Sequence, residues 1–356
     1  MKSNKTTESK FKPAIAGGTW TAPISSENLP INKSNKTTEK NTGRPAVFYL
    51  DGGAGRILCA IPALEYYALT HYNFSIITHL KEEFFKENPI LHKYVHSFNE
   101  EGLFDNIIKE GEMIMLEPYF RYEYYNQECS LIQAFDLEIN GGYCIGDKAP
   151  KLHFSRTEEI DNKRNIEEIK EEYKSVDKPH LVFQPFGASA QLFEDGIFDY
   201  TNRSFVMENI VDVIQLLRQD YLILWMGNLR LNISNHTNPI VYVNEMGLRE
   251  WAGYIKHADH FLGCDSVGQH IAKAVGTKST VVIGSTYPIN ISYPDDDMVT
   301  IFDVGEERRV YEPIRITMDQ KRSEKNQGIM LMGDHIIDNL IESIHTNCPL
   351  SASKLS

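Results

Sequence analysis

The sequence predicts an α/β fold in which two α/β domains face one another across a cleft. Two stretches of the chain alternate short apolar runs with helical patterns, and a charged segment separates the two stretches. Short apolar runs bounded by turn residues are typical of buried parallel strands, and their alternation with helices is typical of layered α/β proteins. Because such sheets bind ligands at the carboxyl ends of their strands, we expect the functional site in the cleft.

The first 45 residues differ in composition from the rest. They are polar and rich in Lys, Ser, Thr and Asn, and the segment 2–8 recurs unchanged at 33–39. Such a segment buries too little apolar surface to offset the entropy of ordering it. We therefore expect a mobile N-terminal arm over residues 1–45, within which the segment 17–20 docks on the folded body.

Residues 46–177 are predicted to form the first domain. Its first strand is an apolar run between Pro45 and a glycine-rich loop, and helical periodicity follows that loop. From 105 to 155 the pattern is too irregular to assign. The predicted elements are the strands 46–50 and 73–78, the helix 56–70 and a helix that begins over 81–86.

A charged run from 156 to 178 predicts a solvated helix and, after it, a domain boundary at 176–179. A second alternation of apolar runs with helical patterns predicts a domain over 178–330. Residues 331–356 are expected to form a C-terminal helix and a tail. The predicted strands are 180–184, 221–226, 240–243, 260–263 and 279–283, and the predicted helices are 204–219, 248–256, 267–275 and 334–344.

Composition excludes several classes of function. A net charge of −13 argues against a broad grip on nucleic acid or anionic lipid. The 5 cysteines are scattered, so neither a disulfide framework nor a zinc site is predicted. No apolar signal core and no run of about 18 apolar residues occurs, so we expect a cytoplasmic protein without an integral membrane segment.

Two further motifs resemble a cofactor site and a metal site, but their residues do not support either kind of site. Gly53-Ala54-Gly55 follows a strand, but the third glycine position of a dinucleotide fingerprint is Leu58, and the second strand does not end in an acidic residue. The acidic triplet 295–297 follows Pro294 without an accompanying ligand cluster, which favours a solvated loop. We expect no bound cofactor and no metal.

The segment 254–286 holds the strongest functional signal. Within it a short strand ends at Gly263, and a helix begins directly after Asp265 and Ser266, which are both good N-cap residues. The unpaired N–H groups and positive dipole end of that helix favour an anion. His270, one turn into the helix, is expected to point towards the bound group.

Two other strand ends strengthen this prediction. A glycine–hydroxyl loop leaves the strand 279–283 and another leaves the strand 180–184, so three such loops are expected to converge in one crevice. Arg203 follows one of them and supplies a cation for phosphate. The candidate donor-binding residues are Gly187, Ser189, Arg203, Asp265, Ser266, Gly268, Gln269, His270, Gly284, Ser285 and Thr286.

The order of these motifs closely resembles the ADP-heptose:lipopolysaccharide heptosyltransferase family, a glycosyltransferase family 9-like group. Its second domain runs G-A-S, K-x-W, D-S-G-P-x-H-x-A-A-A-x-G and G-P-T, and the corresponding residues here are Gly187-Ala188-Ser189, Arg203-Ser204-Phe205, Asp265 to Gly276, and Gly284-Ser285-Thr286. In the first domain, Gly55-Arg56-Ile57-Leu58 to Pro62-Ala63-Leu64 is similar to the family's G-D-x-L-x-x-x-P-x-L. The similarity covers roughly residues 47–75 and 180–290.

This resemblance implies a GT-B enzyme with two Rossmann-like domains, which is inverting and does not strictly depend on a metal. The nucleotide-sugar donor would bind the second domain and the acceptor the first. Ser189 and Arg203 would contact donor phosphate. Asp265, Ser266, His270 and the Ser285–Thr286 loop would hold the diphosphate and the sugar.

The family's acidic residue in G-D-x-L, its usual base candidate, is Arg56 here, and an arginine does not act as a base near neutral pH. We take Asp51 as the substitute base, with Glu65 and Glu117 as rivals, and Arg56 as a clamp for an anionic group. The family's G-P becomes Val267-Gly268, so a donor other than ADP-heptose is compatible with the sequence.

The leading hypothesis is therefore a glycosyltransferase that moves a sugar from a nucleotide diphosphate donor to a hydroxyl acceptor. The acceptor is either a saccharide or a hydroxymethylated DNA base, as in bacteriophage enzymes that modify their own genomes. A nucleotide-sugar epimerase and a non-catalytic nucleotide-sugar binder are the alternatives.

Overall fold

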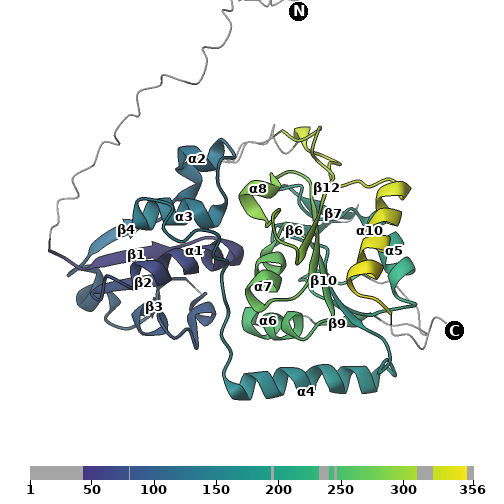
Figure 1. Cartoon of the computed structure of the whole chain (residues 1–356), viewed down its shortest axis with the longest axis horizontal. Coiled ribbons are helices and arrows are strands. Elements are labelled where there is room, and N and C mark those ends of the chain that lie inside the picture. Colours follow the sequence, from purple (N-terminus) through teal and green to yellow (C-terminus); the bar gives the residue numbers. More distant parts are fainter. Residues whose placement is uncertain are drawn as a thin grey trace, which may run out of the picture. The chain divides into compact units, whose positions relative to one another are not determined.

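The structure is a computed structural model that describes residues 43–79, 81–193, 196–231, 240–243, 247–310 and 324–350. These residues form two parallel sheets, one short antiparallel hairpin and the surrounding helices (Figure 1). The α/β fold class predicted from the sequence is confirmed, whereas the domain boundaries and the two-domain cleft stay predictions. The arm expected over 1–45 lies outside the described residues, apart from its last three.

The first sheet is formed by four parallel strands: β1 (Ala46–Leu50), β2 (Phe74–Thr78), β3 (Val95–Ser97) and β4 (Glu112–Met115). Their order across the sheet is β3-β2-β1-β4, with Ala46 opposite both Phe74 and Glu112. β2 is buried along its whole length, while β4 at the edge is largely exposed.

The second sheet is formed by six parallel strands: β5 (His180–Gln184), β8 (Leu222–Trp225), β9 (Val241–Tyr242), β10 (His260–Cys264), β11 (Ser279–Ile283) and β12 (Val299–Asp303). Their order is β12-β11-β10-β5-β8-β9. Between β5 and β8 the chain forms the hairpin of β6 (Ala190–Phe193) and β7 (Gly196–Asp199). β5, β10 and β11 are buried throughout, as their continuous apolar sequences predict.

The α-helices are α1 (Ala54–Tyr67), α2 (Tyr122–Tyr125), α3 (Leu131–Asn140), α4 (Arg156–Glu172), α5 (Met207–Leu217), α6 (Leu248–Lys256), α7 (Val267–Val275), α8 (Pro288–Ile291) and α10 (Asp334–Asn347). Short 3-10 helices cover Glu82–Phe85, His92–Tyr94 and Pro118–Phe120, and a π-helix covers Phe104–Ile108.

One hydrophobic core joins elements of both sheets. It contains Phe48 of β1, Ile57 of α1 and Ile271 of α7, all with at most 2% of their surface exposed. α1 packs against α3, which belongs with the first sheet. It also packs against α7, the helix that follows β10 of the second sheet. This packing brings the start of α1 close to the carboxyl end of β10.

The prediction that an α-helix begins over residues 81–86 is wrong. The structure has only the 3-10 turn Glu82–Phe85 there, and the chain continues without a helix into Pro89. Proline disfavours helical backbone in the residue before it, so Asn88 cannot extend a helix. Its side-chain oxygen instead accepts hydrogen bonds from the N–H groups of Ile90 and Leu91, at 3.0 and 2.9 Å.

Candidate functional site

β11, β10 and β5 are adjacent and parallel, so their carboxyl ends lie along one edge of the second sheet. Hydrogen bonds link the segments that leave this edge. Thr286 Oγ1 donates to Asp265 Oδ2 at 2.8 Å, and Ser285 Oγ donates to the Thr201 carbonyl oxygen at 2.7 Å. Ser189 Oγ in turn lies 3.0 Å from Thr201 Oγ1. The structure thus brings together the three loops singled out in the sequence, 187–189, 265–266 and 284–286.

Asp199, at the end of β7, organises the turn that follows the hairpin. Its carboxylate accepts hydrogen bonds from Ser189 Oγ and Ser204 Oγ, each at 2.6 Å, and from the Thr201 N–H at 2.8 Å. Burial raises the pKa of Asp199, but the hydrogen bonds from these residues outweigh burial, so its pKa lies below the ordinary value. Ser204 Oγ in turn accepts from the Gly187 N–H at 3.0 Å. No motif in the sequence pointed to Asp199.

Arg203 extends from this turn towards the end of β10. Its Nη1 lies 3.7 Å from Asp265 Oδ2, and its Nε donates to Thr201 Oγ1 at 3.1 Å. Burial lowers the pKa of Arg203, but the charges of Asp265 and Asp199 raise it by more, so the net pKa is raised. The site therefore contains a permanently charged guanidinium that is only 18% exposed. Such a group suits a phosphate oxygen.

Asp265 is the centre of the same network and only 3% exposed. Besides Arg203 and Thr286, it contacts Gln269, whose Nε2 donates to Asp265 Oδ1 at 2.9 Å. Its carboxylate therefore orients a cation, a hydroxyl and an amide. Within the described residues, the buried Oε1 of Gln269 has no hydrogen-bond partner.

The start of α7 is shaped by Gln184 at the end of β5. Ser266 occupies the N-cap position, but its side chain makes no capping hydrogen bond, contrary to the capping role expected from the sequence. Gln184 Oε1 instead accepts from the Gly268 N–H at 2.9 Å, and Gln184 Nε2 donates to Ser266 Oγ at 3.3 Å. A Cβ at position 268 would overlap Gln184 and Phe261, so this position requires glycine.

His270 lies against α1 and not towards an open space at the helix start. A Cβ on Gly55 would lie 2.6 Å from its Cδ2 atom, and its Nδ1 is 2.9 Å from Tyr293 Oη and 3.6 Å from Cys59 Sγ. Burial lowers the pKa of His270 to about 4, so the ring is neutral at physiological pH. His270 therefore packs α7 against α1.

The candidate base residues lie in different surroundings. Asp51 is exposed at the end of β1, and its Oδ1 accepts from the Gly52 N–H at 2.6 Å. Arg56, in the first turn of α1, is only 9% exposed and its Nη2 lies 3.1 Å from Glu117 Oε1. Glu65, further along α1, accepts from Asn88 Nδ2 at 2.8 Å.

The loop after β11 depends on a close backbone approach at Gly305. A Cβ at that position would overlap the carbonyl oxygen of Gly284. We expect Gly305→Ala to lower the free energy of unfolding by about 1–3 kcal/mol, because the backbone must shift. Urea unfolding measures this. The matched control is Gly333→Ala, where nothing lies within 4 Å of the new Cβ, and equal effects of the two substitutions would contradict the role of Gly305.

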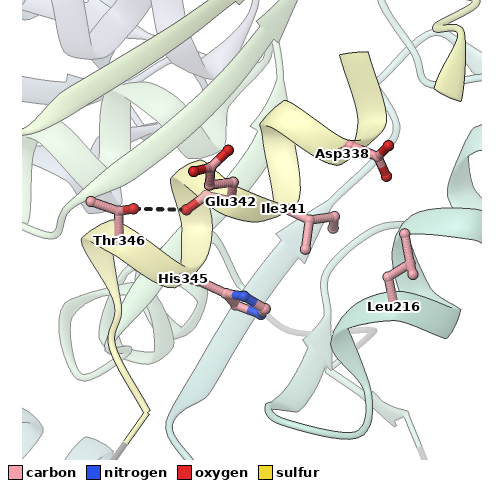
Figure 2. A pocket seen from close by; sticks show the side chains of 6 residues that line it. All are labelled: Leu216, Asp338, Ile341, Glu342, His345 and Thr346. Carbon is pink, nitrogen blue, oxygen red and sulfur yellow. Dashed lines mark hydrogen bonds between the residues drawn. The ribbon is translucent and has the colours of Figure 1, made fainter. Parts of the chain in front are cut away.

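Two hollows lie outside this network. One, of about 390 Å³, lies between α5 and α10, and the imidazole of His345 is part of its lining (Figure 2). Another, of about 500 Å³, lies beside α4 and α6 and is lined by Arg249 and Tyr254. Neither is lined by a candidate donor-binding residue. The side chains around the first are Leu216, Asp338, Ile341, Glu342, His345 and Thr346.

The acidic triplet 295–297 behaves as the solvated loop that the sequence favours. Asp296 pairs with Lys273 and accepts from the Met298 N–H at 2.9 Å, while Asp295 and Asp297 are exposed. In the described part of the chain, no group of three or more His, Cys, Asp and Glu side chains is arranged to hold a metal ion. Among the same residues, no helix has both the length and the apolar character needed to span a bilayer.

No protein-family model matches the sequence, and no curated protein matches it. Solved structures do resemble it. A glycosyl transferase family 9 protein from Veillonella parvula has a TM-score of 0.61 and 12% identity, over 86% of this chain and 98% of that one. The iron-containing dodecameric glycosyltransferase TibC from enterotoxigenic E. coli has a TM-score of 0.53 and 12% identity, over 85% and 76%.

The ADP-heptose lipopolysaccharide heptosyltransferase II of E. coli has a TM-score of 0.51 and 13% identity, over 81% of this chain and 98% of that one. At such identities the likeness concerns the fold. The resemblance drawn from the sequence motifs is thereby confirmed at the level of structure: the chain has the fold of glycosyltransferase family 9 and of the ADP-heptose lipopolysaccharide heptosyltransferases.

Proposed function

We propose that the chain is an inverting, metal-independent glycosyltransferase that moves a sugar from a nucleotide diphosphate donor to a hydroxyl acceptor. The observation that carries this proposal is the position of Arg203. It is a largely enclosed cation at the carboxyl ends of three adjacent strands, in a chain with a glycosyltransferase fold. Ligands of open α/β sheets bind at such strand ends.

Arg203 and the start of α7 supply the charge that the donor diphosphate needs. As the bond to the sugar breaks, negative charge builds up on the departing diphosphate, and fixed cations and N–H dipoles stabilise it. Asp265 and Thr201 hold the guanidinium in place before the donor binds. This preorganised charge supports a reaction that does not depend on a metal ion.

Gln269 and the loop 284–286 are proposed to contact the diphosphate or the sugar. The buried Oε1 of Gln269 lacks a partner in the described residues, and an unsatisfied buried acceptor favours a ligand hydroxyl. Ser285 and Thr286 are buried and donate their hydroxyl hydrogens to other parts of the site, so their backbone N–H groups are the candidates for the ligand.

A saccharide acceptor is proposed in preference to a modified DNA base. One solved structure with this fold is a lipopolysaccharide heptosyltransferase. No observation in the described residues favours DNA. The acceptor hydroxyl must lose a proton, and Asp51 and Glu117 are the candidate bases.

Replacing Arg203 tests donor binding. We expect Arg203→Gln to abolish most of the thermal stabilisation that a matching nucleotide sugar gives the wild type, because the cation facing the diphosphate is lost. At about one hundred times its Kd, a donor should stabilise the wild type by about 2.7 kcal/mol. Thermal shift with ADP-, UDP- and GDP-sugars measures this. The control is Arg164→Gln, an exposed arginine of α4, and equal stabilisation of both variants would contradict the proposal.

A further inference from the structure

The carboxyl end of β4 carries a side-chain cluster around Glu117. Arg56 Nη2 lies 3.1 Å from Glu117 Oε1 and also donates to the Leu116 carbonyl oxygen. On the other side, Glu138 Oε1 accepts from the Glu117 N–H at 2.8 Å. Both the backbone and the carboxylate of Glu117 are therefore held, while its side chain stays 43% exposed and can meet a substrate.

This cluster lies next to the candidate donor site. Arg56 follows Gly55, whose Cα packs against the ring of His270. The Arg56 guanidinium also lies 5.3 Å from the ring centroid of Tyr119. α1, which carries Arg56, thus packs against His270 of α7, one of the candidate donor-binding residues.

The other carboxylates are less suited to meet an acceptor there. Glu65 lies about 13 Å further along α1 at the usual helical rise and is bonded to Asn88. Asp51 turns its Oδ1 back onto its own loop at Gly52. Glu138 has a buried Oε2, which is withdrawn from an acceptor in solvent, and its Oε1 accepts from the Glu117 N–H.

We propose that Glu117 is the general base of the transfer reaction and that Arg56 is the positioning residue that orients its carboxylate. This inference rests on the proposed function. The acceptor hydroxyl gives its proton to the Glu117 carboxylate, and its oxygen forms a bond to the anomeric carbon of the donor sugar. The bond from that carbon to the phosphate oxygen breaks, and its electron pair leaves with the nucleoside diphosphate beside Arg203.

The arrangement explains how an arginine stands at the position where the resembled family has an acid. The carboxylate is supplied by the end of the neighbouring strand, and the arginine fixes its orientation. A Cβ on Gly52 would lie 3.2 Å from Arg56 Cδ and 3.3 Å from its Nη1, so the glycine loop leaves room for this side chain.

The test uses the full chain and a panel of ADP-, UDP- and GDP-sugars with water as acceptor. Release of nucleoside diphosphate gives turnover, and calorimetry with the matching nucleoside diphosphate gives binding and reports on folding. We expect Glu117→Gln to lower kcat at least about 100-fold, the usual contribution of a general base, with Kd unchanged. Glu117→Asp should recover part of the rate. The control is Glu110→Gln, an exposed glutamate before the opposite end of β4, which should behave as the wild type.

Arg56 is tested by the separation of kcat from binding. We expect Arg56→Met to lower kcat about tenfold, with the nucleoside diphosphate Kd unchanged, and Arg56→Lys to recover part of that loss. A purely structural role would impair binding and turnover together.

Three outcomes would overturn the inference. If the wild type binds no nucleotide and consumes no nucleotide sugar, the proposed function is wrong and the base assignment with it. If the wild type turns over and Glu117→Gln keeps its rate, only the base assignment is wrong. If Asp51→Asn loses more activity than Glu117→Gln, the base is Asp51.

Discussion

Arg249→Met is expected to lower the free energy of unfolding by about 3–5 kcal/mol, because it removes one partner of a largely buried ion pair. Arg249 is the second residue of α6, and its Nε lies 2.5 Å from Glu158 Oε1 of α4. Its Nη1 also donates to the carbonyl oxygens of Glu83 and Lys86, at 3.2 and 3.3 Å. The substitution therefore leaves these carbonyls without that donor, and Glu158 keeps only the Ser155 N–H and the exposed Lys86 as partners. Urea unfolding measures the loss.

The pH dependence of this loss identifies its cause. Hydrogen bonds from Arg249 hold the pKa of Glu158 below its ordinary value, against the opposing effect of burial. A lowered pKa stabilises the fold above the unfolded-state pKa of about 4.3, and this stabilisation is lost as the pH falls below that value. The difference between wild type and Arg249→Met should therefore be largest near pH 7 and shrink below about pH 4.

The matched control is Arg164→Met on α4. Arg164 pairs with Asp161 at 2.7 Å but is 58% exposed, so its loss should cost less than about 1 kcal/mol. Equal effects of Arg164→Met and Arg249→Met would contradict a special role for Arg249.

Asp199→Asn is expected to weaken nucleotide binding at least tenfold and to lower the free energy of unfolding by about 2 kcal/mol. Asparagine replaces one acceptor oxygen by an N–H₂ group, which then faces hydroxyl and N–H donors of Ser189, Thr201 or Ser204. The turn that carries Arg203 loses its anchor as a result. Calorimetry with the nucleoside diphosphate and urea unfolding measure the two effects.

The control for Asp199 is Asp212→Asn, the same change at an exposed position on α5. It should leave both binding and stability close to those of the wild type. Normal nucleotide affinity in Asp199→Asn would show that the turn does not depend on this carboxylate.

The fold was predictable wherever a segment is buried on both sides. β5, β11, α6 and α7 have the predicted residues at both ends, because their apolar patterns stop at turn residues and caps. The first sheet's β4 was not predicted because it lies in the unassigned region 105–155, although Met113 to Leu116 form a short apolar run. α3 lay in the unassigned region 105–155, although the capping box of Ser130 and Gln133 was a usable signal for its start.

The loops of the site were predictable from the sequence, whereas the contacts between residues far apart in the chain were less so. Glycine–hydroxyl loops at strand ends are local patterns, and the structure brings all three together. The role of Asp199 depends on the hairpin of β6 and β7, whose exposed residues Leu192, Phe193 and Phe198 gave no alternating pattern. The pairing of Arg56 with Glu117 joins residues 61 positions apart and has no local signature. The assignment of the candidate residues to donor and acceptor stays a prediction.

Turnover of nucleotide sugars by the wild-type chain is the most direct test of glycosyl transfer. Incubation with ADP-, UDP- and GDP-sugars, followed by analysis of the released nucleotide and of the anomeric configuration of the sugar product, gives one result per donor. We predict that one nucleotide series releases its nucleoside diphosphate, with inversion at the anomeric carbon and at an equal rate in the presence of EDTA. Release of no nucleoside diphosphate from any donor, or recovery of only an isomerised nucleotide sugar, would contradict it.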